Sequence, residues 1–519
     1  MPDLAARDLV ALALALGARD VPGWSPAEDA LARGVRPSDA TSLRETIARG
    51  EDPLGEAFCA LRSPGERREL GATYTPSAIV RAMLAWTQTI AAPDTIVDPG
   101  VGSARYLVAA ARLHGRANLV GVEIDPLAAL LARAHLAAAG LAGRSRIVVA
   151  DYRDFERPAG RTLFIGNPPY VRHHRIAPAW KRWLTREATA LGLRASQLAG
   201  LHVHFFLRTA AIAREGDAGA FITAAEWLDV NYGTVVRELL LRRLHARSIH
   251  LIDPRALPFA DAATTAAITC FEVGHRASIR FRRVDSLEDL GALGGGAPVS
   301  RARLAKATRW SHLGRKRARA GWVELGELCR VHRGQVTGAN RVWIEGPHSA
   351  GLPTSVLYPT VTKARELFQA APELRTIAHL RRVIDLPEDL DALPAAERDA
   401  IEAFLREARK LGADQGFIAR HRRAWWSVGL REPAPILATY MARRAPAFVR
   451  NFARARHINI AHGLYPRVRL DERTLTRLVD HLAGATSVTE GRTYAGGLTK
   501  FEPREMERLL VPGPDLLAS

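Results

Sequence analysis

The sequence predicts an α/β protein built around a parallel, doubly wound sheet. Between residue 71 and about residue 275, short β-rich runs alternate with helical stretches, which is the pattern of strands joined by crossover helices. One run leads directly into a Gly-rich turn, and acidic residues end three runs, as they do at the ligand-binding edge of such sheets. The predicted strands cover residues 95–97, 119–124, 147–150, 163–165, 219–223, 248–252 and 266–273.

The regions outside this sheet define the remaining parts of the chain. Residues 1–70 are rich in Ala, Leu and Arg and predict a helical arm. A Gly-rich break at 294–296, followed by Ala297 and Pro298, predicts a linker that continues into a basic stretch. We therefore expect four parts, namely a helical arm at 1–70, a catalytic domain at 71–285, a basic linker at 286–320 and a further domain at 321–519.

Composition limits the class of protein. The 519 residues suffice for about two to four domains, and a hydrophobic content of 47% supports a sizeable core. Three scattered cysteines are too few for a disulfide framework or a zinc ribbon. No apolar run approaches the ~20 residues of a membrane span, and the N-terminal residues do not resemble a signal peptide. We expect a cytoplasmic protein with no membrane association.

The net charge indicates a polyanionic partner. Lys and Arg number 73 against 54 Asp and Glu, which gives a net charge of +19. Residues 301–519 contain 37 basic and 23 acidic residues, a net +14, whereas the first 300 residues contain 36 and 31, a net +5. A soluble protein this basic usually binds a polyanion, which we expect to lie mostly against the C-terminal part.

The ends of the first three predicted strands carry residues suited to a nucleotide. Small residues in the turn let a ligand approach the backbone, and the following helix offers free N–H groups. The next two strands end at Glu123 and Asp151, and an acid at the second position can hydrogen-bond a ribose diol. Each acid by itself could be a helix N-cap, but Asp98, Glu123 and Asp151 at three successive strand ends favour a nucleotide site. The turn itself is Asp98-Pro99-Gly100-Val101-Gly102-Ser103-Ala104-Arg105-Tyr106.

The fourth predicted strand runs into Asn167-Pro168-Pro169-Tyr170. Two consecutive prolines fix an extended turn and remove two backbone donors, so this loop mainly offers acceptors. The side-chain oxygen of Asn167 and the adjacent carbonyl can together accept both hydrogens of an exocyclic amine. Tyr170 provides a flat face for stacking. This combination suits a base that has been rotated out of a nucleic-acid duplex.

Taken in order, these motifs resemble the S-adenosylmethionine-dependent N6-adenine DNA methyltransferases of the gamma class, which occur in restriction–modification systems. The resemblance covers residues 71–275 and begins with Gly71-Ala72-Thr73-Tyr74-Thr75-Pro76. It implies a class I methyltransferase fold, which is a Rossmann-like, mostly parallel sheet of seven strands, with a C-terminal mixed α/β target-recognition domain. The implied activity is site-specific methyl transfer to N6 of a flipped-out adenine in double-stranded DNA.

The resemblance also implies the site residues. The Tyr-Thr-Pro segment lies over the methionine part of the cofactor, Glu123 binds the ribose, and Asp151 lies near the cofactor adenine. No metal is implied. The implied catalytic residues are Asn167, Pro168, Tyr170 and Phe259, of which the last packs against the target base. The implied S-adenosylmethionine-binding residues are Tyr74, Thr75, Pro76, Asp98, Gly100, Gly102, Tyr106, Glu123, Ile124, Asp151 and Asn167.

In the C-terminal part, three segments resemble portions of a target-recognition domain: residues 325–340, residues 457–460 and residues 499–503. Candidate phosphate contacts are Arg315, Lys316, Arg317 and Arg319, although a solvated linker would have the same composition. Another group interleaves basic and aromatic residues, although tryptophans in such a pattern more often belong to the core. It consists of Arg422, Arg423, Trp425, Trp426, Arg443 and Arg444.

Several alternatives stay open. The catalytic loop also occurs in enzymes that methylate RNA or a protein glutamine, so these substrates are alternatives. Ala104 stands where the family has a third loop glycine, which is tolerated if its φ is negative and otherwise favours a weakly active DNA-binding relic. An Asp/Glu-x-Lys nuclease motif is absent, since no lysine has an acid two residues before it. DNA cleavage would therefore require a separate restriction endonuclease.

Overall fold

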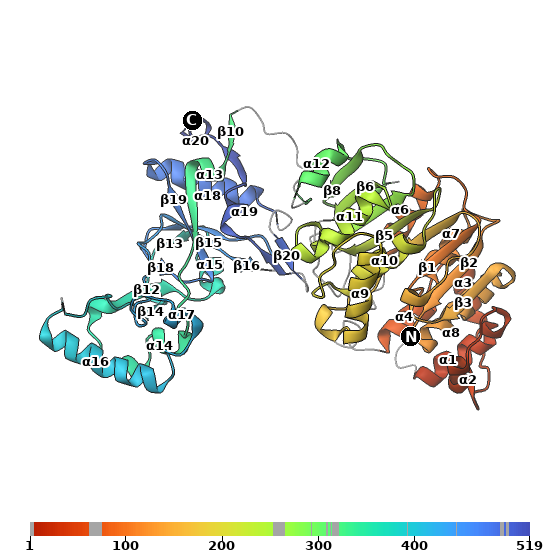
Figure 1. Ribbon diagram of the computed structural model, residues 1–519, viewed down its shortest axis with the longest axis horizontal. Helices are drawn as coiled ribbons and strands as arrows, with labels where there is room; N and C mark the ends of the chain where they lie inside the picture. Colours follow the sequence, from red (N-terminus) through yellow and green to blue (C-terminus); the bar gives the residue numbers. More distant parts are fainter. Residues whose placement is uncertain are drawn as a thin grey trace. The chain divides into compact units, whose positions relative to one another are not determined.

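The computed structural model describes residues 5–61, 75–252, 265–291, 293–307, 310–311, 313, 321–391, 393–442, 444–487, 492–494 and 498–518. The chain divides into two compact units (Figure 1). The first consists of Met1–Arg315 with Ala495–Gly497, and the second of Lys316–Tyr494 with Leu498–Ser519. None of the helices in the described ranges is long and apolar enough to cross a membrane.

The first unit is built on a nine-stranded sheet in the order β3-β2-β1-β4-β5-β7-β6-β8-β9. Strands β1 to β5 run parallel to one another, whereas β7 is antiparallel to both β5 and β6. The strand bounds are β1 Thr95–Pro99, β2 Asn118–Glu123, β3 Ser145–Val149, β4 Thr162–Gly166, β5 Ala218–Ala224, β6 Ala246–Ile252, β7 Ala266–Glu272, β8 Ile279–Val284 and β9 Ala297–Val299.

All seven predicted strands are confirmed as β1 to β7, but the prediction of a seven-stranded sheet is wrong by two strands. Strand β8 pairs in parallel with β6, and β9 pairs antiparallel with β8. Ala297 and Pro298, which the Gly-rich break suggested to be linker, lie in β9 at the sheet edge, where a proline needs no ladder donor. Helix α12 (Arg301–Lys306) follows at once, so residues 297–306 are folded.

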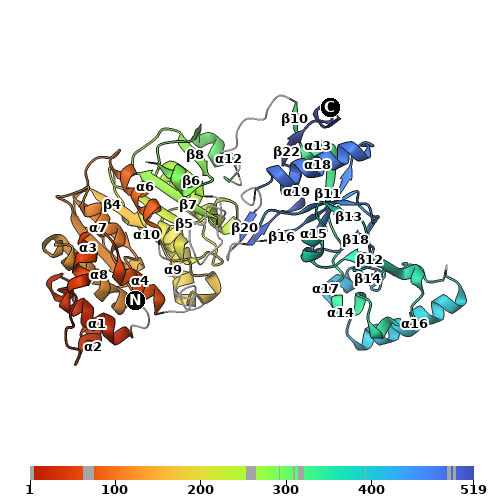
Figure 2. The same cartoon turned by 180° about the vertical axis from the view of Figure 1, so that it is seen from behind.

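Helices cover both faces of this sheet, as views from opposite sides show (Figures 1 and 2). One core contains residues of α6 (Ser77–Thr87), α7 (Arg105–Ala111) and α8 (Pro126–Ala138). The other contains residues of α9 (Pro178–Ala190), α10 (Leu201–Ile212) and α11 (Thr234–Arg242). Adjacent strand residues alternate between them, for example Ile96 and Val97, because successive side chains point to opposite faces.

The N-terminal arm is helical, as predicted, and packs on α8 through Leu130, Leu131 and Ala134. Its helices are α1 Ala6–Ala15, α2 Pro26–Ala32, α3 Thr41–Ala48 and α4 Pro53–Ala60. Arg133 of α8 and Glu28 of α2 form a fully buried ion pair at 2.5 Å. The same guanidinium donates to the carbonyls of Val21, Pro22, Gly23 and Ile147, so its burial is compensated.

The second unit contains a five-stranded sheet in the order β11-β19-β15-β17-β13 and three smaller sheets. The larger sheet has an apolar core on the side of α18. The strands are β10 Trp322–Glu324, β11 Cys329–Arg333, β12 Leu357–Val361, β13 Glu373–Leu374, β14 Arg381–Ile384, β15 Ile436–Thr439, β16 Met441–Ala442, β17 Phe448–Asn451, β18 Arg456–His457, β19 Ala461–Pro466, β20 Arg492–Tyr494, β21 Leu498–Lys500 and β22 Leu510–Pro512. The helices are α13 Leu325–Leu328, α14 Asn340–Trp343, α15 Ala364–Ala370, α16 Ala395–Lys410, α17 Phe417–Arg420, α18 Glu472–Ala485, α19 Pro503–Met506 and α20 Pro514–Ala518.

Candidate active site

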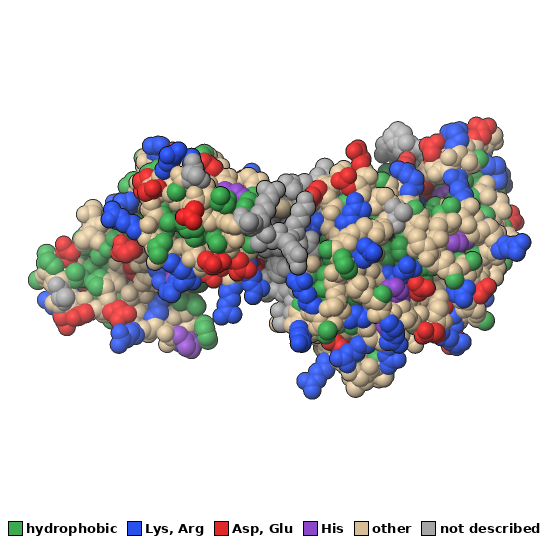
Figure 3. All heavy atoms as spheres, turned by 90° about the horizontal axis from the view of Figure 1, so that it is seen from above, with side chains coloured by type: hydrophobic (Ala, Val, Ile, Leu, Met, Phe, Trp, Pro, Cys, Tyr) green, Lys and Arg blue, Asp and Glu red, His purple; other side chains and the backbone are tan. Residues whose placement is uncertain are grey.

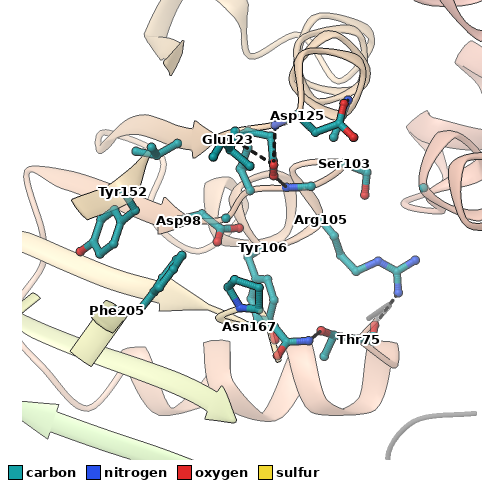
Figure 4. Close-up of a pocket in the computed structure, with 18 of the residues that line it drawn as sticks. Thr75, Asp98, Ser103, Arg105, Tyr106, Glu123, Asp125, Tyr152, Asn167 and Phe205 are labelled. Atoms are coloured by element: carbon teal, nitrogen blue, oxygen red, sulfur yellow. Dashed lines mark hydrogen bonds between the residues drawn. The ribbon is translucent and has the colours of Figure 1, made fainter. Parts of the chain in front are cut away.

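A cavity of about 230 Å³ lies at the carboxyl ends of β1 to β4 (Figure 4). Parallel strands bring their carboxyl ends to one edge, so residues far apart in sequence meet there. Of the predicted site residues, nine line the cavity: Thr75, Asp98, Gly100, Gly102, Tyr106, Glu123, Ile124, Asp151 and Asn167. Pro76 and Pro168 adjoin lining residues in sequence, and Tyr170 follows the lining residue Pro169, but none of the three is part of the lining. Tyr74 and Phe259 lie outside the described residues.

The loop after β1 adopts left-handed backbone conformations at three positions. Gly100 has a φ of 108°, Gly102 a φ of 52° and Ala104 a φ of 65°. The sequence analysis expected Ala104 to replace the family's glycine without cost only if its φ were negative. The φ of Ala104 is positive, so this condition is not met. An L-residue in this region costs roughly 1–2 kcal/mol relative to its ordinary conformation. Ala104 is nevertheless fully buried at the start of α7, where its methyl group contributes to the core.

Asp98, the last charged residue of β1, is 1% exposed. Neither carboxylate oxygen has a hydrogen-bond partner within the described part of the chain. Burial raises the pKa of this carboxyl well above its ordinary value, and the neighbouring charge of Glu123 raises it further. A Cβ on Gly166 of β4 would lie 2.3 Å from Asp98 Oδ1, so the glycine makes room for the carboxylate. A buried, uncompensated carboxylate lining a cavity calls for a positively charged ligand group.

Glu123 closes the loop onto the end of β2. Its Oε1 accepts from the backbone N–H groups of Ile124 at 2.9 Å and Asp125 at 3.1 Å, and its Oε2 accepts from Gly102 at 3.0 Å. Burial raises the pKa of Glu123, and the same backbone donors oppose the rise. Beside it, the side chain of Ile124 is 67% exposed and lines the cavity, which leaves an apolar surface for a ligand.

Asp151 follows β3 and is engaged by a residue that the sequence analysis missed. Arg153 donates Nε to Asp151 Oδ1 at 2.8 Å and forms a second contact from Nη2 to Oδ2. The guanidinium carbon lies 3.6 Å from the ring centroid of Trp180 in α9, a cation–π geometry. Arg153 lies two residues after Asp151 and also lines the cavity, but a single arginine among 73 basic residues gave no signal.

Asn167 follows β4 and donates Nδ2 to Thr75 Oγ1 at 3.1 Å (Figure 4). Because the amide is planar, this bond directs Oδ1 away from Thr75. Tyr170, three residues on, packs against the core and donates its hydroxyl to Ile222 O at 3.4 Å. Burial raises the pKa of Tyr170 well above its ordinary value, so its hydroxyl stays protonated.

The N-terminal arm supplies a wall of the cavity, which the sequence did not indicate. Gly55, Phe58 and Cys59 of α4 are lining residues. Asp52, the N-cap of α4, is 5% exposed and accepts from Gly55 N at 2.9 Å. Its Oδ2 also accepts from two residues of the loop after β1, Ser103 Oγ at 2.5 Å and Arg105 Nε at 3.2 Å.

Arg105 extends this network toward the catalytic loop. Its Nη1 donates to Thr75 O at 2.8 Å, and Thr75 in turn binds Asn167. The sequence Asp52-Pro53 indicates the start of a helix. The hydrogen-bond partners of the Asp52 side chain, Ser103 and Arg105, lie 51 and 53 residues away along the chain. Spacing alone could not reveal that the arm holds the cavity together.

In the second unit, the three segments that resembled a recognition domain lie close together. Gln335 forms a bridge with Ile458, and Asn459 donates its N–H to Gln335 O at 3.0 Å. His462 Nε2 lies 2.5 Å from Phe501 O. Trp425 and Trp426 pack against an apolar core, which confirms the core interpretation of these tryptophans. The candidate phosphate contacts Arg315, Lys316, Arg317 and Arg319, together with Arg443, lie outside the described residues.

A mostly parallel sheet with β7 inserted antiparallel between β5 and β6, and a nucleotide-sized cavity at the ends of β1 to β4, define a class I S-adenosylmethionine-dependent methyltransferase. Family models agree: Eco57I restriction-modification methylase matches residues 154–256, and the C-terminal domain of type II methyltransferase M.Eco57I matches residues 303–519. Type II methyltransferase M.XamI of Xanthomonas campestris pv. amaranthicola is 50% identical over 98% of each chain. The chain belongs to the type II DNA methyltransferases of restriction–modification systems, and S-adenosylmethionine is its methyl donor.

More distant matches cover less or are less similar. Type II methyltransferase M.AccI of Acinetobacter calcoaceticus is 22% identical over 85% of each chain. A tRNA1(Val) (adenine(37)-N6)-methyltransferase of Porphyromonas gingivalis is 33% identical over 116 residues, which are 20% of this chain and 46% of that protein. The type IIG restriction endonuclease BpuSI aligns with a TM-score of 0.49 at 14% identity, over 98% of this chain and 70% of its own.

Proposed function

We propose that this methyltransferase modifies the exocyclic N6 of an adenine that is rotated out of double-stranded DNA. The observation that carries the proposal is the position of Asn167 at the cavity, with its amide oriented by Thr75. Oδ1 of Asn167 and the adjacent backbone carbonyl would accept the two hydrogens of the amine. The P. gingivalis relative, whose name specifies adenine N6, supports the choice of atom.

The residues around the cavity fit S-adenosylmethionine. Asp98 offers a buried carboxylate to the positively charged methionyl part of the cofactor. Thr75, Pro76 and Tyr74 would contact the same part, as the family resemblance implies. Glu123 uses two acceptor positions of Oε1 and one of Oε2 for backbone donors, so Oε2 can still accept a ribose hydroxyl. Gly100 and Gly102 let the ligand approach the loop backbone, and the side chain of Tyr106 lines the cavity beside them.

The adenine end of the cofactor would lie between Ile124 and Asp151. Ile124 provides an apolar face, and Asp151 an acceptor for the amino group of the cofactor adenine. Arg153 fixes the orientation of Asp151 through two contacts, so this acceptor is positioned before the cofactor binds.

The chemistry follows from these positions. The bound cofactor supplies a methyl group on a positively charged sulfur. The adenine amine is a weak nucleophile because its lone pair is delocalised into the ring, and accepting both of its hydrogens favours a more tetrahedral nitrogen. The nitrogen would form a bond to the methyl carbon as the carbon–sulfur bond breaks, which would leave S-adenosylhomocysteine, and one amine proton would pass to solvent. No metal or covalent base adduct is needed. Orienting the two reactants can supply several kcal/mol. Pro168 would hold the loop extended, and Tyr170 and Phe259 would pack against the base.

The remaining assignments concern the whole protein. We propose that residues 321–519 recognise the DNA sequence and that residues 1–70 and 71–285 are arm and catalytic domain. Of the predicted linker 286–320, β9 and α12 belong to the catalytic unit. We further propose that the enzyme acts in the cytoplasm on DNA. Restriction would come from a separate endonuclease. Each of these assignments rests on the family membership and on the charge of the C-terminal part.

Mass spectrometry of methylated nucleosides tests the reaction. Purified full-length protein is incubated with S-adenosylmethionine and plasmid DNA, and the DNA is digested to nucleosides. We expect N6-methyldeoxyadenosine, and none from Asn167→Ala. N4-methyldeoxycytidine as the product, or methylation of RNA in preference to DNA, would contradict the proposal.

A further inference from the structure

The net positive charge of the first 300 residues is concentrated in one short segment. Residues 172–194 contain six Lys and Arg and a single acid, Glu187, a net charge of +5. The other 277 of these residues contain 30 basic and 30 acidic residues and are neutral overall. On the face that Figure 3 draws, the side chains of basic and acidic residues are interspersed over most of the surface. The basic residues of the segment are Arg172, Arg175, Lys181, Arg182, Arg186 and Arg194.

This segment begins at the rim of the active-site cavity. It starts two residues after Tyr170 of the catalytic loop. Leu201, a lining residue, donates its N–H to Val171 O at 2.9 Å, which fixes the start of the segment beside the cavity. The segment then forms α9, whose buried side carries Trp183, Leu184 and Ala188.

The opposite side of α9 exposes like charges. Arg182 and Arg186 are one turn apart and both are exposed, with Arg186 at 70% side-chain exposure. Equal charges at this spacing destabilise a helix, in contrast to the alternating charges of an ordinary solvated helix. The one acid of the segment, Glu187, forms an ion pair with Arg186, with Oε1 at 3.1 Å from Nη2. Burial lowers the pKa of His173, and the positive charges of Lys181 and His174 lower it further.

We propose that residues 172–194 form the phosphate-binding surface of the catalytic unit, which holds the DNA backbone beside the flipped nucleotide. The inference rests on the proposed action on double-stranded DNA. Arginine on an exposed helix can donate to phosphate oxygens without contacting base edges. This surface therefore contributes affinity independent of sequence, in addition to recognition by the C-terminal unit. A polyanion would also relieve the repulsion between Arg182 and Arg186.

Salt-dependent DNA binding by the full-length protein tests this assignment. The variant R182Q/R186Q/R194Q removes three exposed cations, and R33Q/R36Q/R116Q is the matched control, since these arginines are also exposed. Binding to a 30-base-pair duplex of arbitrary sequence is measured between 50 and 300 mM salt. Each lost phosphate contact lowers the slope of log Kd against log salt by about 0.9, so the slope should fall by about 2 to 3. The control should keep the wild-type slope, and both variants should keep the wild-type cofactor Kd.

A second variant gives the opposite effect. Glu187→Gln removes the one acid of the segment and should tighten binding at low salt several-fold. A wild-type slope in the triple variant, or no tightening by E187Q, would overturn the assignment while leaving the proposed function intact. Failure of the wild-type protein to bind duplex DNA would overturn both.

Discussion

At the residue scale, the catalytic role that we propose for Asn167 depends on its oxygen and on its orientation. Asn167→Ala removes the acceptor and should lower kcat by at least about 10³-fold, while the Kd values for cofactor and DNA stay within about twofold. Thr75→Val removes the bond that orients the amide and should lower kcat about tenfold with little change in the KM for DNA. Single-turnover methylation rates and calorimetric binding measure both effects. Near-normal turnover by N167A would refute the assigned role.

Asp98 links cofactor binding to pH. Burial raises the pKa of Asp98, and the charge of Glu123 raises it further. In the cofactor-free protein, the stability that this carboxyl contributes is therefore fully present below its ordinary pKa of 3.8. This stability is lost as the pH rises toward the raised pKa. The ionised form is the one that attracts a cation, so cofactor binding should strengthen over the same rise in pH.

Asp98→Asn should separate these two effects. Without cofactor, the variant should be more stable than wild type at pH 8 by about 1 kcal/mol or more, because a buried charge is removed. Its cofactor Kd should rise at least tenfold and lose its dependence on pH. Thermal unfolding and titration calorimetry from pH 5 to pH 9 give both quantities. A variant that is less stable than wild type and binds cofactor normally would contradict the account.

Ala104 is a further position where conformation decides the outcome. Ala104→Val places a β-branched side chain at a φ of 65° and should lower the free energy of unfolding by more than about 2 kcal/mol. Ala104→Gly is the matched control, in which relief of backbone strain and loss of a buried methyl group oppose each other, so we expect a change within about 1 kcal/mol. Urea denaturation measures both. Equal stabilities of the two variants would show that the left-handed conformation imposes no constraint.

At the scale of the element, the N-terminal arm lines the candidate active-site cavity. Asp52→Asn keeps the N-cap of α4, since Asn caps as well as Asp, but removes the charge that holds Arg105. We expect kcat/KM to fall about tenfold, with contributions from both the cofactor KM and kcat, because Arg105 also supports Thr75. Asp29→Asn, at an exposed acid of the same arm, is the control and should leave both parameters unchanged. Wild-type kinetics in D52N would show that the network only stabilises the fold.

The strands at the centre of the sheet could be predicted from sequence, and its far edge could not. Strands β1 to β7 are buried apolar runs bounded by turn residues, which is a local signal. Strand β9 contains a proline and follows three glycines, so its local sequence indicates a loop although pairing with β8 makes it a strand. Likewise, the acids at the ends of β1 to β3 could be identified in the sequence as candidate site residues. Asp52 and Arg153 could not, because only their contacts in the folded protein place them at the cavity.

At the scale of the whole molecule, two units divide the work of the enzyme. We propose that the first binds the cofactor and carries the catalytic Asn167. Both units are basic: the first has 41 basic and 31 acidic residues, a net +10, and the second has 32 and 23, a net +9. With cationic surfaces in both, DNA affinity should fall steeply with salt, whereas cofactor affinity, which depends on buried groups, should change little. Parallel titrations of DNA and cofactor at 50 and 200 mM salt measure this difference.

The central claim is site-specific methylation of adenine N6, and long-read sequencing tests it most directly. The full chain is expressed in a host that lacks DNA methylation, with N167A as the control, and modified bases are mapped on the resident plasmid. The account predicts N6-methyladenine at one sequence motif in the wild-type sample and none in the control. Methylation of cytosine, or an unmodified plasmid alongside folded, cofactor-binding protein, would contradict it.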